Sequence, residues 1–139
     1  MEGNSTPETY RMIFTSADRK RERRDRFQGG RGGGFCTHAI APTVRVPGSR
    51  FHQASRVELD PGGVIPEHLH ADNEEIYWIL SGSGFFLDDG IETAAGPGDL
   101  LLTRQGHRHG LRNSGNGPLV FLAIVAGDPH VPSEENSTP

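Results

Sequence analysis

The sequence predicts an all-β fold in a single domain. Its 139 residues match the usual size of one domain. Nineteen glycines and ten prolines divide the chain into many short segments, which favours strands joined by tight turns. No span shows the apolar periodicity of a helix, whereas Asp88-Asp89-Gly90 follows an apolar run and is a strong hairpin signal.

Residues 1–34 are predicted to form an N-terminal arm and a glycine-rich linker. The stretch from Arg19 to Arg31 holds seven of the fourteen basic residues, and Glu22 and Asp25 interrupt it. We interpret it as a solvated arm or a short helix rather than a nucleic-acid-binding arm. The glycines of residues 29–34 are too flexible for regular structure, which predicts a hinge or a loop across a pocket mouth.

Residues 35–127 are predicted to form the β domain, and residues 128–139 a disordered tail. The tail is rich in Pro, Ser and Glu, which is typical of disorder. In the β domain, alternating or continuous apolar runs bounded by turn residues predict strands. Besides the histidine-bearing segments, these runs are Phe35–Ile40, Thr43–Val46, Phe51–Leu59, Glu75–Leu80, Ser83–Leu87, Leu100–Leu102 and Leu119–Val125.

The segment around His68 and His70 predicts a metal site. Residues two apart on an extended strand face the same side, roughly 7 Å apart at the backbone, so both imidazoles can reach one ion. The turn-prone residues 71–73 follow, and a second strand then brings a carboxylate. Glu75 is the predicted ligand rather than Glu74, because Glu74 would face the opposite side of that strand.

The spacing of these residues resembles the paired motifs of the cupin superfamily. Gly62, His68, His70, Glu75 and Gly82 fill the slots of the first motif without a gap. The second motif resembles the set Gly98, Arg104, Gly106, His109 and Asn113, with Arg104 where the family usually has proline. The resemblance covers roughly residues 50 to 126. It implies a cupin-type β-barrel of jelly-roll form, with His109 as the fourth metal ligand.

Three imidazoles and one carboxylate suit one divalent transition metal per chain. Fe(II) is favoured, and Zn, Mn, Ni or Co also fit such a ligand set. The resemblance implies a metal-dependent enzyme that acts on a small organic substrate, foremost a dioxygenase or a related oxidation. The alternatives are a non-redox isomerase, lyase or polyketide-type cyclase, and a cupin that binds a small molecule without turnover.

Three further residues are candidates for catalysis. Tyr77 shares a strand face with Glu75 and is a candidate proton donor, although a buried structural tyrosine is the commoner case. His107 shares a face with His109 and is a candidate general base, with surface exposure as the alternative. Arg56, like His52, precedes the first motif on a strand whose facing the sequence leaves open. His52, with His38 and His130, otherwise has the default interpretation of a surface histidine.

Composition and charge limit the classes of partner that the protein is expected to have. A net charge of −4 gives no general basic field for nucleic acid. No signal pattern or apolar run of membrane length occurs, so a cytoplasmic protein without a membrane partner is expected. Glu75–Leu80 is apolar on both faces, which predicts that a second subunit covers the outer face in a homodimer.

Overall fold

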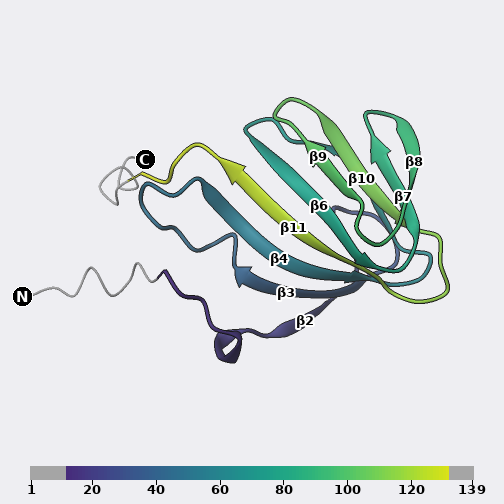
Figure 1. Cartoon of the computed structure of the whole chain (residues 1–139), viewed down its shortest axis with the longest axis horizontal. Helices are drawn as coiled ribbons and strands as arrows, with labels where there is room; N and C mark the ends of the chain where they lie inside the picture. The colour runs from purple at the N-terminus through teal and green to yellow at the C-terminus, as the bar shows by residue number, and fades with distance from the viewer. Residues whose placement is uncertain (1–11, 132–139) are drawn as a thin grey trace, which may run out of the picture.

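The computed structural model describes residues 12–131, and the regular secondary structure of this part of the chain consists of strands apart from one short 3-10 helix (Figure 1). After a short 3-10 helix, η2 (Ser16–Asp18), the strands are β2 (Arg21–Arg24), β3 (Gly34–Ile40), β4 (Phe51–Leu59), β5 (Val64–Leu69), β6 (Asn73–Ser81), β7 (Gly84–Asp88), β8 (Ile91–Ala95), β9 (Leu100–Thr103), β10 (Arg108–Asn113) and β11 (Leu119–Gly127). The predicted all-β class is confirmed.

Two antiparallel sheets pack face to face. The six-stranded sheet has the order β2-β3-β4-β11-β6-β9, and the four-stranded sheet has the order β5-β10-β7-β8. The arrangement is a jelly roll of two sheets and not one closed barrel. Buried apolar side chains from both sheets fill the space between them, among them Leu59, Ile79 and Phe121 from the larger sheet and Ile65 and Leu111 from the smaller.

Strand β6 shows how the sequence pattern sets the facing of side chains. Glu75, Tyr77 and Ile79 are buried between the sheets, whereas Trp78 and Leu80 are about 44% and 43% exposed on the outer face. This is the period-two alternation of a strand. The predicted assignment of Tyr77 to the face of Glu75 is therefore confirmed.

The hairpin between β7 and β8 follows the predicted turn chemistry. Asp89 and Gly90 form the two-residue loop, with φ of 47° and 87°. A type I′ turn needs positive φ at both positions, which Asp and Gly tolerate better than other residues.

The basic segment differs from the expectation of a solvated arm or a short helix. Arg21–Arg24 forms strand β2 and pairs with β3. The guanidinium carbon of Arg21 lies 3.5 Å from the centre of the Phe35 ring, and Arg21 and Arg23 form ion pairs with Glu58 and Asp60. Backbone pairing with β3, supported by these side-chain contacts and not by an apolar pattern, holds the segment in the sheet.

Two residues of the glycine run lie close to the backbone of neighbouring strands. Gly34 begins β3, and a Cβ at this position would collide with the carbonyl oxygen of Glu58. Gly30 has a similar close approach to the carbonyl oxygen of Val64. Glycine is required here because two backbones meet without room for a side chain.

Two segment boundaries also shift. Thr43–Val46, predicted as a strand, is irregular, since Pro42 and the turn that follows interrupt pairing. Order extends beyond residue 127, because buried His130 forms a bridge with Pro47. The remainder of the predicted tail, residues 132–139, and residues 1–11 of the arm lie outside the described residues.

Within residues 12–131, no helix has the length and hydropathy needed to cross a bilayer. The cytoplasmic location stays a prediction.

Candidate metal centre

The four predicted ligands converge on one point between the sheets. His68 on β5 and His109 on β10 are opposite each other in the small sheet, while Glu75 projects from β6 of the large sheet. His70 lies in the turn that joins β5 to β6. One ligand atom from each residue lies within 4.8 Å of all the others.

The distances between these atoms are short. Nε2 of His109 lies 3.1 Å from Nε2 of His68 and 2.9 Å from Nε2 of His70. Oε1 of Glu75 lies 3.0 Å from Nε2 of both His70 and His109. His109 and Glu75 are shielded from water, at 0% and 7% exposed, whereas His68 and His70 are partly buried.

The opposite nitrogen of each imidazole is hydrogen-bonded, and these bonds set the ring orientations. Nδ1 of His68 donates to the carbonyl oxygen of Pro66 at 2.9 Å, and Nδ1 of His70 donates to Oδ1 of Asn73 at 2.5 Å. Nδ1 of His109 is hydrogen-bonded to the Thr103 hydroxyl at 2.8 Å. A proton on Nδ1 leaves a lone pair on Nε2 of the neutral ring, which is the form that binds metal.

This donor set fits a divalent cation. Neutral imidazoles oriented in this way direct bare Nε2 lone pairs at one another and at a carboxylate. Such acceptors repel unless protons or a cation lie between them. A metal ion satisfies all four acceptors at once, and the absence of thiolate ligands separates the site from closed structural zinc centres.

The pKa shifts agree with a site that is ready to bind a cation. Burial lowers the pKa of His68, so this ring is neutral at pH 7. Burial by itself would raise the pKa of Glu75, but hydrogen bonds with His109 and His70 outweigh it and keep the carboxyl ionised. The hydrogen bond with Glu75 raises the pKa of His70, so a proton on His70 is the main competitor of a metal.

A tight turn holds His70 in place and accommodates Arg104. The backbone amide of Gly106 donates to the carbonyl oxygen of His70 at 2.7 Å. The backbone amide of His70 donates to the carbonyl oxygen of His107 at 3.0 Å. Gly106 has a φ of 87°, which favours glycine. The turn therefore forms without the proline that the resemblance led us to expect at position 104.

A cavity of about 420 Å³ opens beside the cluster. His70, Glu75 and Tyr77 form one part of its wall. The Tyr77 ring is buried and stacks on the His109 ring. Burial, together with the nearby charge of Glu75, raises the pKa of Tyr77 well above its usual value, so its hydroxyl stays protonated.

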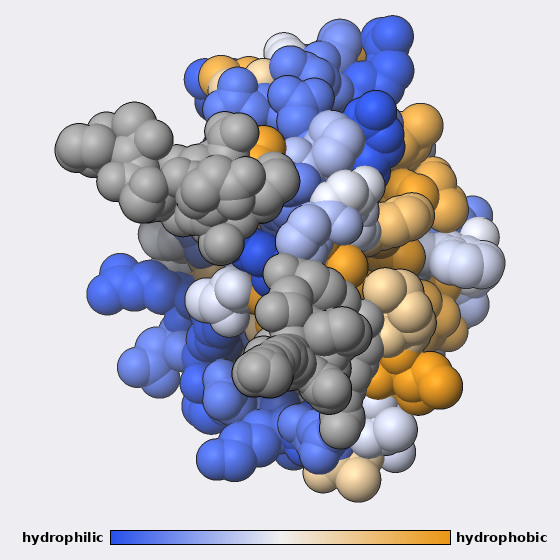
Figure 2. Space-filling view, turned by 90° about the vertical axis from the view of Figure 1, so that its left-hand side faces the viewer, coloured by the Kyte–Doolittle hydropathy of each residue, from blue (hydrophilic) through white to orange (hydrophobic). Residues whose placement is uncertain are grey.

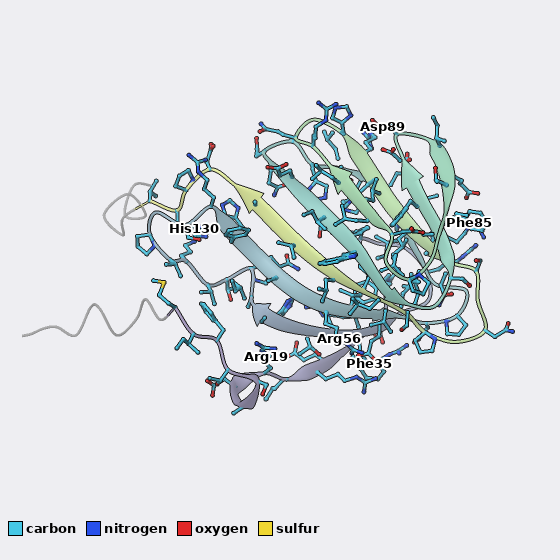
Figure 3. The ribbon with its side chains drawn as sticks, viewed as in Figure 1. Arg19, Phe35, Arg56, Phe85, Asp89 and His130 are labelled. Carbon is cyan, nitrogen blue, oxygen red and sulfur yellow. The ribbon has the colours of Figure 1, made fainter. Side chains whose placement is uncertain are left out.

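The two other catalytic candidates do not line this cavity. Nδ1 of His107 lies 2.6 Å from a carboxylate oxygen of Asp89, at the exposed turn before β10. Arg56 lies on the outer face of β4, where it pairs with Glu58 at 3.0 Å (Figure 3). The alternation of β4 explains this, because Ser55 and Val57 take the inner positions.

Other residues of the site lack a local signal in the sequence. Asn73 and Thr103 orient ligand rings, and only the distance of each to its histidine in the fold reveals that role. His38 and His52, which had a default surface interpretation, line the cavity, as do Arg24 and Arg26 of the basic segment.

Fold and site together define a jelly-roll protein with a partly buried cluster of three histidines and one glutamate of metal-ligand type. The chain belongs to the cupin family, because the family model described as Cupin domain matches residues 55–125.

Named relatives extend this assignment. The oxalate-binding protein of Thermotoga maritima is 32% identical over 114 residues, which cover 82% of this chain and 93% of that protein. A crystal structure from Thermotoga maritima, described as a predicted oxalate decarboxylase, matches with a TM-score of 0.73 and 30% identity over 84% of this chain and 100% of that chain. A dimethylsulfoniopropionate lyase of Ruegeria pomeroyi is 33% identical over 71% of this chain, but the match spans only 43% of that lyase.

Proposed function

We propose that this cupin holds one divalent transition metal at His68, His70, Glu75 and His109, and acts on a small organic acid in the adjoining cavity. The convergence of four ligand atoms within 4.8 Å carries the proposal. The similarity to an oxalate-binding protein supports a small organic acid as the class of ligand. Fe(II) is the favoured ion, and Zn, Mn, Ni and Co suit the same donors.

For the reaction, we propose an oxygen-dependent oxidation of the substrate, as in a cupin dioxygenase. When bound, the metal would supply Lewis-acid polarisation of a substrate oxygen and, as Fe(II), access to O₂ chemistry. The chain itself supplies the cavity wall and a protonated Tyr77 hydroxyl. This hydroxyl acts as a hydrogen-bond or proton donor to the bound substrate.

Two alternatives have specific support. Metal-dependent lyase chemistry without O₂ is supported by the similarity to a lyase that cleaves dimethylsulfoniopropionate. Binding without turnover is supported by the match to the oxalate-binding protein over most of both chains.

Metal analysis followed by oxygen-uptake measurements separates these functions. The purified protein should contain close to one equivalent of metal, and the Fe(II)-loaded protein should consume O₂ with an organic-acid substrate. Turnover without O₂ uptake would favour the lyase class. Saturable binding without any turnover would favour the binding protein, and absence of metal binding would refute the proposed centre.

We further propose that the chain forms a homodimer through the outer face of β6, β9 and β11. Trp78 pairs with Leu100 of β9 and with Leu122 of β11, and Leu102 is about 50% exposed beside them. Figure 2 shows the resulting apolar surface along its right-hand side. A continuous apolar sheet face of this kind marks an interaction surface, and a two-fold dimer would bury the same face of both copies.

A further inference from the structure

The cavity has a second polar end, on β3 and β4. Nδ1 of His38 lies 2.5 Å from the Ser55 hydroxyl, and Nε2 of Gln53 donates to the same hydroxyl at 3.0 Å. The Arg24 guanidinium lies 3.4 Å from Nε2 of His38. Arg24, His38 and Gln53 line the same cavity as the metal cluster.

The strand register gives the distance between the metal cluster and the second polar end of the cavity. His38 on β3 is opposite Ser55 on β4, Ser55 is opposite Ala123 on β11, and Ala123 is opposite Tyr77 on β6. His38 and Tyr77 thus lie in one row across the sheet, three strand spacings or about 14 Å apart at the backbone. The wall between them includes the apolar side chains of Val57, Phe121 and Ala123.

The charges of the wall are divided between these ends. Glu75 is the only carboxylate among the described residues that line the cavity, and it belongs to the metal cluster. Arg24 of β2 and Arg26, two residues after that strand, also line the cavity, and Arg24 contacts His38 at the second polar end. Successive side chains of a strand point to opposite faces. Arg23 is turned toward Asp60, with which it forms an ion pair, so the side chain of Arg24 is turned to the other face and lines the cavity.

We propose that the substrate is an elongated dicarboxylic acid, with one carboxylate anchored at the metal cluster and the second at Arg24. This inference rests on the proposed function and specifies its substrate class. A cavity of about 420 Å³ is in the range that holds ligands much larger than oxalate. A guanidinium fork suits a terminal carboxylate, and the apolar wall suits a hydrocarbon spacer.

Calorimetric titration of Mn(II)-loaded protein with a dicarboxylate series from oxalate to suberate tests the inference. The wild type should bind one of the longer acids at least tenfold more tightly than oxalate. Arg24→Gln should lose roughly ten- to hundredfold in affinity for that longer acid, the range expected for one charge-assisted hydrogen bond, and should keep its affinity for oxalate.

Arg23→Gln is the matched control, because it removes the same charge from the adjacent position on the outer face. It should leave every affinity unchanged, and melting curves should show that both variants are folded. Equal binding across the series, or equal affinities for wild type and Arg24→Gln, would overturn the inference while leaving the metal centre intact. Failure to load metal would overturn the proposed function, and the inference with it.

Discussion

The Tyr77 ring lies flat against the His109 ring, with ring centroids 4.2 Å apart and an angle of 18° between the planes. The phenol thus supports a candidate metal ligand and lines the cavity at the same time.

Tyr77→Phe keeps the stacked ring and removes only the hydroxyl. We expect metal content and melting temperature to stay unchanged, and turnover to fall about 10²- to 10⁴-fold if the hydroxyl transfers a proton. Steady-state kinetics beside metal analysis test this, and unchanged kcat would assign Tyr77 a packing role.

His70→Ala should remove most of the bound metal, because one of the four converging donors is lost. Elemental analysis of purified protein measures the effect. His107→Ala is the matched control, because His107 pairs with Asp89 outside the cluster and its loss should leave the metal content unchanged. Near-stoichiometric metal in His70→Ala would refute the ligand assignment.

Thr103→Val should weaken metal binding about 10- to 100-fold without removing a ligand, since the hydroxyl orients the His109 ring. Valine has nearly the same shape as threonine, so the buried site stays filled. A competition titration with a chelator gives the affinity. Wild-type affinity in this variant would mean that packing alone orients His109.

The stabilisation by added metal should increase with pH. The His70–Glu75 interaction raises the pKa of His70, so it stabilises the metal-free fold below pH 6.5 and is lost as the pH rises through the raised pKa. Metal binding must displace this proton, so affinity should rise roughly tenfold per pH unit until His70 is deprotonated.

Melting curves between pH 6 and 8, with and without Mn(II), measure this dependence. The Glu75 contribution does not interfere, because the pKa of Glu75 is lowered and its contribution is lost only at acid pH. A metal-induced shift in melting temperature that is independent of pH would contradict the prediction.

Trp78→Lys should reduce the mass measured by light scattering at micromolar concentration from that of a dimer to that of a monomer. The substitution places a charge in the apolar outer face of β6. Ile91→Lys is the control, because Ile91 is about 67% exposed on the other sheet. A monomeric wild type would refute the dimer proposal.

Local strand and turn geometry predicted His68, His70 and Glu75, whereas His109, 39 residues beyond His70, was predicted only through the resemblance to the second cupin motif. Glu75 was distinguishable from Glu74 through strand alternation, and Glu75 is indeed the buried one. Strand β2 was not predictable from apolar periodicity, since all four of its side chains are exposed and its contacts come from β3 and β4.

The second end of the cavity was not predictable for a related reason. His38 and Tyr77 are 39 residues apart in the chain. They share a row only through the register of β3, β4, β11 and β6. Register over several strands is a property of the whole sheet, and no short motif encodes it.

The candidate ligands come from both sheets, with His68 and His109 on the smaller and Glu75 on the larger. A bound cation would therefore cross-link the two sheets, since they could not separate at this end without breaking coordination bonds. Loading should accordingly slow unfolding more than it speeds folding, and amide exchange in β5, β6 and β10 should slow in concert.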